Sequence, residues 1–333
     1  MAIDWLKVTP RGLYCEPGDF FIDPASAVER AVITHGHGDH ARPGNAHVLA
    51  TAETIAIMRR RMGETAGGTL DAAAYGETRT LGGVSVRLVP AGHILGSAQA
   101  VLEHDGARVV ISGDYKRRAD PTCPPFEPVP CDVFITEATF GLPVFRHPPD
   151  GEEIERLLHS VKLYPERCHL VGVYALGKCQ RVLMLLRRAG YLDPVYLHGA
   201  LIGLVELYQS LGVAMGEVRP VAGVSRDDLR GKIVMAPPSG DADAWARRLP
   251  DPVVAFASGW MRVRQRAKQR GVELPLVISD HADWDELLQT IADCAPGEIW
   301  VTHGAEEALV RQATLSGYRA RALAVPGFEA EEE

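Results

Sequence analysis

No uninterrupted run of about 18 apolar residues occurs in the sequence, and this absence argues against a membrane-spanning helix. The first residues lack a basic segment followed by an apolar stretch, so we expect no secretory signal. The 6 cysteines are scattered among 333 residues without CxxC spacing, which predicts neither a zinc ribbon nor a disulfide framework. Such cysteines are typical of reduced thiols, and we therefore expect a cytoplasmic protein that does not contact a membrane.

The chain also lacks an excess of positive charge, because its formal net charge is −8 at pH 7. This balance argues against a protein that coats nucleic acid nonspecifically, although a nucleic-acid enzyme can hold phosphates with a local basic patch or with metal ions. The remaining composition is ordinary, with 46% hydrophobic and 23% charged residues. A chain of this length and composition is typical of a soluble globular protein with two domains.

Three histidines and one aspartate within six consecutive residues are the most informative feature of the sequence. They are His35, His37, Asp39 and His40, and they follow the apolar run 31–34. Polar side chains crowded in this way need compensating partners, because their desolvation is costly. Two metal ions would supply these partners, with the first two histidines facing one ion and Asp39 and His40 facing the other. The alternative is a solvated histidine-rich loop, which the preceding apolar run disfavours.

Three further ligand candidates stand just after strand patterns. A ligand in this position is held by a rigid element and still reaches open space, as a metal site that admits substrate requires. A single histidine or aspartate there is usually a turn residue, so the signal lies in the repetition of strand, small residue and ligand. The pairs of strand and candidate are 84–90 with His93, 109–112 with Asp114 and 298–302 with His303.

Glu137 and His281 are candidates for proton transfer. Apolar strand patterns precede both of them, 132–136 in front of Glu137 and 276–279 shortly before His281. A carboxylate that hydrogen-bonds a histidine orients the ring and raises its pKa, which yields an acid that can protonate a leaving oxygen. The alternative is that the acids at these strand ends only cap the following helices, as Asp283 is placed to do.

Basic residues form a dense run shortly before His281. Five cations occupy every second position, namely Arg262, Arg264, Arg266, Lys268 and Arg270. On a strand they would form one basic stripe, whereas on a helix they would spread around its surface. One interpretation is a solvated face. We favour contacts with the phosphates of a nucleic acid, because the run lies close to His281 in the sequence.

The pattern of predicted secondary structure changes near residue 150, which predicts two domains. Residues 13–137 show mostly short strand patterns with one helix near 51–62, whereas later residues alternate helix and strand in the manner of a parallel sheet covered by helices. Ligand candidates occur on both sides of the alternating part, so we expect that part to be an insertion. The predicted segments are 1–147 and 274–328 for the first domain, 148–273 for the inserted domain and 329–333 for an acidic tail.

Taken in order, the motifs resemble those of the metallo-β-lactamase superfamily, and within it the β-CASP nucleases. The motifs that carry the resemblance are 34–40, His93, Asp114, Glu137, His281 and His303. The resemblance implies an α/β fold, an αββα sandwich into which a β-CASP α/β domain is inserted. In the family's scheme His35, His37 and His93 bind one ion, Asp39, His40 and His303 bind the other, Asp114 bridges the two, and Asp23 supports the ligands.

The resemblance also implies a catalytic set. Two divalent ions would activate a water molecule and neutralise the phosphate, and the histidine-rich ligands make zinc the first expectation and manganese the second. His281, oriented by Glu137, would protonate the leaving oxygen. Asp39 would serve both as a ligand and in catalysis.

Substrate contacts are expected at two places. The turn 174–180 resembles a family element in which Lys178 and backbone N–H groups at a helix N-terminus could hold a phosphate. The alternative is that Gly177 merely forms a turn. In the basic run, Arg262 and Arg264 are the expected contacts.

Two details bear on the substrate. His303 resembles the RNA-processing branch, because Artemis-like DNA nucleases generally lack a histidine at that motif. The short length and the strings 36–44 and 279–284 are instead similar to bacterial ligase-associated DNA exonucleases. The resemblance therefore implies an exonuclease for single-stranded DNA that acts in DNA repair alongside a DNA ligase and a helicase. The alternative is an RNA-processing endonuclease or exonuclease of the 3′-end-processing or RNase J type.

Overall fold

The computed structural model describes residues 3–238 and 245–326. These residues form two compact units. The first unit comprises Met1–Val144 and the return segment that begins at His281, and the second comprises Phe145–Asp280. Within the described residues, no helix is long and apolar enough to cross a membrane.

The unit boundaries differ by a few residues from the predicted ones at 147/148 and 273/274. At the second boundary the reason is β17 (Leu274–Leu276), which pairs in parallel with β16 (Val253–Ala257) and so belongs to the sheet of the second unit. The strand predicted over 276–279 is thus replaced by one that ends at Leu276. The acidic tail predicted for 329–333 lies outside the described residues.

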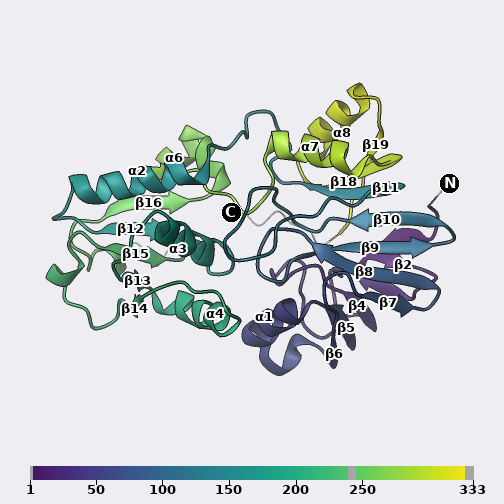
Figure 1. Cartoon of the computed structure of the whole chain (residues 1–333), viewed down its shortest axis with the longest axis horizontal. Coiled ribbons are helices and arrows are strands. Elements are labelled where there is room, and N and C mark those ends of the chain that lie inside the picture. Colours follow the sequence, from purple (N-terminus) through teal and green to yellow (C-terminus); the bar gives the residue numbers. More distant parts are fainter. Residues whose placement is uncertain (1–2, 239–244, 327–333) are drawn as a thin grey trace. The chain divides into compact units, whose positions relative to one another are not determined.

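In its described residues, the first unit consists of two mixed sheets and three α-helices (Figure 1). The first sheet has the order β1-β2-β3-β4-β5-β6, with β1 Leu6–Thr9, β2 Gly12–Cys15, β3 Phe20–Ile22, β4 Arg30–Val32, β5 His47–Ala50 and β6 Thr69–Ala72. The second has the order β19-β18-β11-β10-β9-β8-β7, with β7 Thr78–Leu81, β8 Val84–Pro90, β9 Ala98–His104, β10 Ala107–Ile111, β11 Val133–Ala138, β18 Glu298–Gly304 and β19 Arg319–Ala322. The helices are α1 Ala52–Met62, α7 Trp284–Cys294 and α8 Glu306–Leu315, with the 3-10 turn η1 Gly63–Ala66.

Three apolar layers hold the first unit together. Because side chains alternate along a strand, each sheet presents one face to the other sheet and one to helices. Ile22 of the first sheet and Leu88 of the second belong to the layer between the sheets. Met58 of α1 packs on the outer face of the first sheet, and Leu287 of α7 on that of the second. Each such side chain stabilises the fold by about 1.5–3 kcal/mol, and the layers confirm the predicted αββα sandwich.

Among residues 145–238 and 245–280, the second unit contains one sheet of six strands in the order β14-β13-β15-β12-β16-β17, and every pairing in it is parallel. Its remaining strands are β12 His169–Gly172, β13 Val195–Leu197, β14 Val218–Pro220 and β15 Ile233–Ala236. Its helices are α2 Asp150–Leu163, α3 Lys178–Arg188, α4 Gly199–Ser210 and α6 Arg264–Gln269, with the 3-10 turns η2 Asp227–Leu229 and η3 Gly259–Arg262. Parallel strands buried under crossover helices read as continuous apolar runs, which is why the sequence reveals them.

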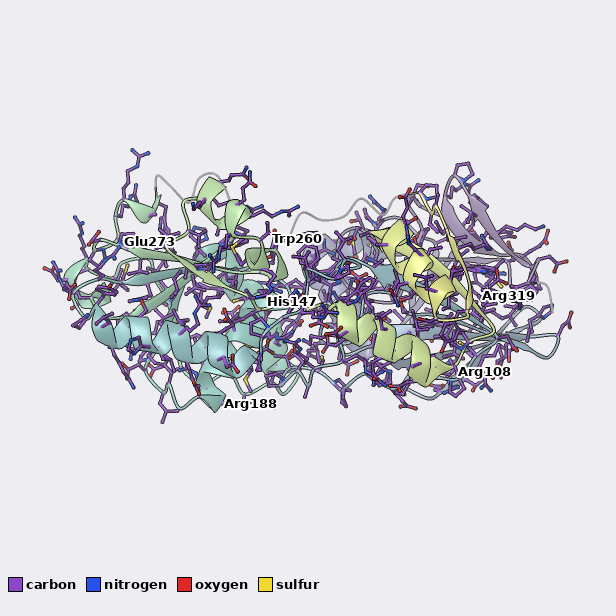
Figure 2. All side chains as sticks on the ribbon, turned by 90° about the horizontal axis from the view of Figure 1, so that it is seen from above. Arg108, His147, Arg188, Trp260, Glu273 and Arg319 are labelled. Atoms are coloured by element: carbon purple, nitrogen blue, oxygen red, sulfur yellow. The ribbon has the colours of Figure 1, made fainter. Side chains whose placement is uncertain are left out.

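Most of the basic run lies on a helix and not on a strand. Arg262 ends η3, and the run continues through α6. The side chains therefore spread around the surface instead of forming one stripe. Arg266 stacks on Trp260, labelled in Figure 2, with its guanidinium carbon 4.0 Å from the ring centroid.

A buried histidine gives the second unit a predictable acid sensitivity. His169 on β12 is fully buried, its Nε2 lies 2.8 Å from Ser160 Oγ, and burial lowers its pKa from 6.5 to about 4. Below pH 6.5 the unfolded chain binds a proton that the folded chain does not, so stability falls with pH until about pH 4. We expect His169→Gln to flatten this acid limb, as measured by urea unfolding between pH 7 and 4.5. Parallel curves for the variant and the wild type would contradict the assignment.

Candidate metal centre

The first group of predicted ligands converges on one point of the first unit. Ligand atoms of His35, His37, His93 and Asp114 lie within 4.8 Å of one another. His37 Nδ1 lies 3.1 Å from Nε2 of His35 and 3.0 Å from Nε2 of His93. These side chains follow the ends of β4, β8 and β10, as the strand patterns predict. Three imidazole nitrogens and a carboxylate oxygen form a donor set that zinc favours.

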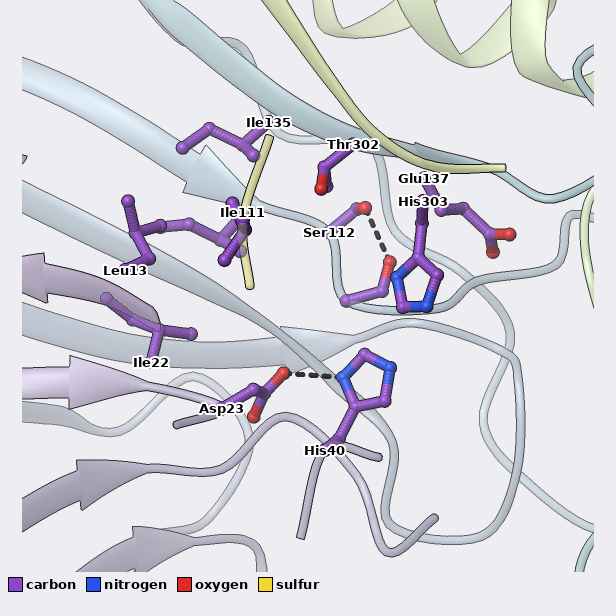
Figure 3. A pocket seen from close by; sticks show the side chains of 12 residues that line it. Leu13, Ile22, Asp23, His40, Ile111, Ser112, Ile135, Glu137, Thr302 and His303 are labelled. Atoms are coloured by element: carbon purple, nitrogen blue, oxygen red, sulfur yellow. Dashed lines mark hydrogen bonds and ion pairs between the residues drawn. The ribbon is translucent and has the colours of Figure 1, made fainter. Parts of the chain in front are cut away.

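The second group lies beside the first and shares an aspartate with it. Ligand atoms of Asp39, His40 and His303 lie within 4.8 Å of one another. The rings of His40 and His303 are stacked, with centroids 5.4 Å apart, and face each other in Figure 3. Asp114 Oδ2 lies 3.5 Å from Nε2 of His35 in the first group and 3.5 Å from Nε2 of His40 in the second. This position between the groups is the one expected of a bridging ligand.

The protonation states of the cluster fit divalent cations. Burial lowers the pKa of His35 well below its usual value, so this imidazole is neutral, as a metal ligand must be. Burial alone would raise the pKa of Asp114, but the neighbouring His40 and His281 hold it well below its usual value. Within the part of the chain that the structure describes, Asp114 Oδ1 is buried without a hydrogen-bond partner. An ionised carboxylate oxygen withdrawn from water in this way needs a cation, and a metal ion would satisfy it.

Asp23 orients His40 from behind the cluster. Its Oδ2 lies 2.8 Å from Nδ1 of His40, as the dashed line in Figure 3 marks, and the ring's Nε2 then faces the ligands. The same carboxylate accepts hydrogen bonds from Thr34 N at 2.8 Å and Thr34 Oγ1 at 2.6 Å. A carboxylate that fixes the tautomer and orientation of a ligating histidine is a common support of metal sites.

A small cavity lies next to this support. Its volume is about 30 Å³, and Asp23, His40 and His303 line its polar side (Figure 3). Isoleucines and a leucine of both sheets, Leu13, Ile22, Ile111 and Ile135, line the other side. This space suits a water molecule, since a cavity of about 10–15 Å³ already holds one. It is too small for a nucleotide, so the cavity is not the substrate site.

A β-bulge aims His303 at the cluster. The register between β11 and β18 pairs Thr136 with Val301 but Ala138 with Gly304, so two residues of β18 oppose Glu137. His303 has a φ of 63°, in the left-handed region that non-glycine residues rarely adopt. A bulge of this kind bends the strand and redirects a side chain, and such strain gathers at functional sites. Sequence patterns did not predict the bulge, although the glycine after His303 is a weak signal of it.

The predicted acid pair forms against the cluster. His281 Nδ1 lies 2.9 Å from Glu137 Oε2, and the rings of His281 and His93 are 4.7 Å apart. Glu137 is held in turn, because it accepts hydrogen bonds from Tyr115 N at 2.7 Å and Thr139 Oγ1 at 2.6 Å. Ligand atoms of Asp114, Glu137 and His281 also lie within 4.8 Å of one another. Glu137 is therefore not merely a helix cap, whereas Asp283 does cap α7, as expected.

The predicted substrate contacts lie in the second unit and differ in character. Lys178 is fully buried, and its Nζ lies 3.1 Å from Asp280 Oδ2. Gly177 has a φ of 86°, so this geometry favours the alternative in which the segment is a structural turn. Arg262 and Arg264 are exposed and so remain available for a substrate.

Comparisons with known proteins identify several to which this chain is similar in sequence. No family model matches the chain. It is 29% identical over 305 residues to a probable DNA ligase of Opitutus terrae, covering 90% of this chain and 29% of the relative. It is 32% identical to cleavage and polyadenylation specificity factor subunit 3 of Dictyostelium discoideum, covering 47% of this chain and 20% of the relative. It is 29% identical to endoribonuclease YSH1 of Gibberella zeae, covering 50% and 20%.

The chain therefore spans less than a third of the length of these curated relatives. Among solved structures, a protein of unknown function from Enterococcus faecalis has a TM-score of 0.57 at 13% identity, covering 90% of this chain and 80% of that one. This likeness concerns the fold alone. The convergence of the ligand groups and the acid pair agrees with these relatives, which support a β-CASP nuclease of the metallo-β-lactamase fold.

Proposed function

We propose that the chain is a metal-dependent nuclease that hydrolyses phosphodiester bonds of single-stranded DNA, as an exonuclease that works in DNA repair alongside a DNA ligase and a helicase in the cytoplasm. One observation carries the reaction class. Two ligand groups share Asp114, and the His281–Glu137 pair lies against them. This arrangement matches the demands of phosphodiester hydrolysis, which needs neutralised phosphate oxygens and a proton for the leaving group.

Each ligand group would hold one divalent ion, zinc by first preference and manganese by second. When bound, the two ions supply an activated water molecule and neutralise charge on the phosphate. The ligands would be His35, His37 and His93 for one ion and Asp39, His40 and His303 for the other, with Asp114 shared between them.

Three side chains, Asp39, His281 and Glu137, would position the water molecule and deliver the proton. Burial raises the pKa of Asp39, but the neighbouring His40 and the hydrogen bond with His303 lower it by more, so Asp39 stays ionised. Its carboxylate can therefore orient the attacking water. The water oxygen bonds to phosphorus and loses one proton to solvent, while the bond between phosphorus and the ribose oxygen breaks. His281 gives its proton to the departing ribose oxygen and is reprotonated from solvent, so the reaction consumes one water molecule overall. Glu137 stabilises the ring while it carries the proton. Such general-acid help is typically worth about 10²–10⁴-fold in rate.

The choice of DNA rests on the relatives. The DNA ligase relative aligns with 90% of this chain, whereas the two RNA-processing relatives align with about half of it. Exposed Arg262 and Arg264 would contact substrate phosphates, as an electrostatic contact independent of sequence. The second candidate is an RNA-processing nuclease. It is favoured by the endoribonuclease relatives and by His303 in the last ligand position.

Matched DNA and RNA substrates test both candidates. The protein is stripped of metal with a chelator and then supplied with zinc or manganese, together with end-labelled single strands of identical sequence. We expect no cleavage without metal, and with metal a progressive shortening of DNA to mononucleotides, read on a sequencing gel. Internal RNA products would favour the second candidate. No cleavage of either strand under any metal would overturn the proposal.

A further inference from the structure

Arg118, which has no role in the proposed reaction, joins the turn 281–283 to the loop 114–118 that follows β10. Arg118 lies four residues after Asp114, and α7 begins three residues after His281. Arg118 Nη2 lies 2.8 Å from Asp283 Oδ2, and Arg118 Nε lies 3.1 Å from Glu286 Oε1. Asp283 and Glu286 are the N-cap and the third residue of α7 and form its capping box.

This contact is placed to control the N-terminus of α7. Asp283 Oδ1 accepts from Glu286 N at 3.0 Å, and Glu286 Oε2 accepts from Asp283 N at 3.0 Å. The two carboxylates have exposed side-chain fractions of only 4% and 15%, so without Arg118 they would face each other with little solvent to separate their charges. The cap residue stands two positions after His281.

The backbone of the same loop holds the turn from the other side. Ala282 N donates to Tyr115 O at 2.7 Å, and Tyr115 N donates to Glu137 Oε1 at 2.7 Å. The main chain of Tyr115 therefore contacts Glu137 and the residue that follows His281. Arg118 adds a charge contact between this loop and the cap residue, at the end of α7 nearest to His281.

Arg117 provides a matched comparison within the same loop. Its Nη2 lies 2.6 Å from Asp293 Oδ2, near the C-terminal end of α7. The two arginines are neighbours, bind carboxylates of the same helix and have similar exposed fractions of 23% and 26%. They differ in which end of α7 they hold.

We propose that Arg118 is a positioning residue, which keeps the turn 281–283 in place so that His281 can deliver its proton to the leaving oxygen. This inference rests on the proposed function. Displacing a catalytic group by about 1 Å can cost about 10²-fold in rate, so the expected loss lies between about 10-fold and 100-fold. The loss should be confined to reactions that need the proton.

The test compares two phosphodiesters. A polynucleotide releases an alkoxide, which needs a proton, whereas bis(4-nitrophenyl) phosphate releases 4-nitrophenolate, which leaves without one. In the full metal-loaded chain, we expect Arg118→Met to slow polynucleotide cleavage about 10–100-fold and to change hydrolysis of the small diester by less than about 3-fold. Arg117→Met should leave both rates within about 3-fold of wild type. Arg118→Lys should restore most of the polynucleotide rate, because the cation is kept.

A combined variant supplies the second readout. Once His281 is gone, its position no longer matters, so Arg118→Met added to His281→Ala should not slow polynucleotide cleavage further. Metal content and melting temperature are measured for each protein, and Arg118→Gln replaces the methionine variant if that one does not fold. Equal losses on both substrates, an equal loss in Arg117→Met, or an additive loss in the combined variant would each overturn the inference. A wild-type protein that hydrolyses no polynucleotide would instead overturn the proposed function.

Discussion

Asp114→Asn is expected to remove nearly all phosphodiester hydrolysis and to lower the bound metal below two ions per chain. The change keeps the shape of the side chain but removes the charge that lies 3.5 Å from the nearest nitrogen of both His35 and His40. Shared ligands of paired ions contribute several kcal/mol to binding and charge neutralisation, and each 1.4 kcal/mol is about tenfold in rate. We therefore expect a loss of at least about 10³-fold.

Metal analysis by mass spectrometry and steady-state cleavage rates measure this effect. Asp105→Asn is the matched control, because its side chain is 86% exposed and its φ of 48° is one that asparagine tolerates. The control should retain metal and rate. A variant at Asp114 with two bound ions and undiminished cleavage would show that the carboxylate does not bridge the two groups.

His281→Ala should have the opposite signature, with full metal content and little polynucleotide cleavage. Among the described residues, His281 lies outside both proposed ligand groups, the four residues around His35 and the three around His40. It groups instead with Asp114 and Glu137, and its Nδ1 lies 2.9 Å from Glu137 Oε2. Removing a general acid typically costs about 10²–10⁴-fold. The loss should appear in kcat more than in KM, because the proton is needed only as the bond breaks.

Exposed His47 supplies the control for this change. Its side chain is 54% exposed, lies at the start of β5 and belongs to neither ligand group, so His47→Ala should leave cleavage unchanged. Hydrolysis of bis(4-nitrophenyl) phosphate by the His281 variant should stay near the wild-type rate. If the variant loses its metal, or cleaves polynucleotides as fast as wild type, His281 does not act as the acid.

The candidate ligands of the centre could be predicted from the sequence because each one lies near or after the C-terminal end of a strand. An alternating pattern of apolar residues predicts a buried strand from only a few residues. A histidine or aspartate that ends such a pattern can therefore be recognised in the sequence. The structure brings together all seven predicted ligands, and the residues are His35, His37, Asp39, His40, His93, Asp114 and His303. Relations of this kind are local, so a single sequence is enough to reveal them.

Features that depend on distant pairs could not be predicted in the same way. Arg118 and Asp283 are 165 residues apart, and no periodic pattern links a surface arginine with one helix cap among many. The same holds for Lys178, whose partner Asp280 turns a candidate phosphate ligand into part of a buried ion pair. The bulge at His303 depends on the register between two strands, which the residues of either strand alone do not define.

The loop from Asp114 to Arg118 couples two properties of the centre, its affinity for cations and the delivery of a proton by His281. Its first residue is the proposed shared ligand, its second donates a backbone hydrogen bond to Glu137, and its fifth forms an ion pair with the cap residue of α7. An inserted or deleted residue anywhere in this stretch would shift cation affinity and proton delivery at once. Natural or engineered variation that tunes one without the other should therefore accumulate outside these five positions, for example on the side of Asp23 or Thr139.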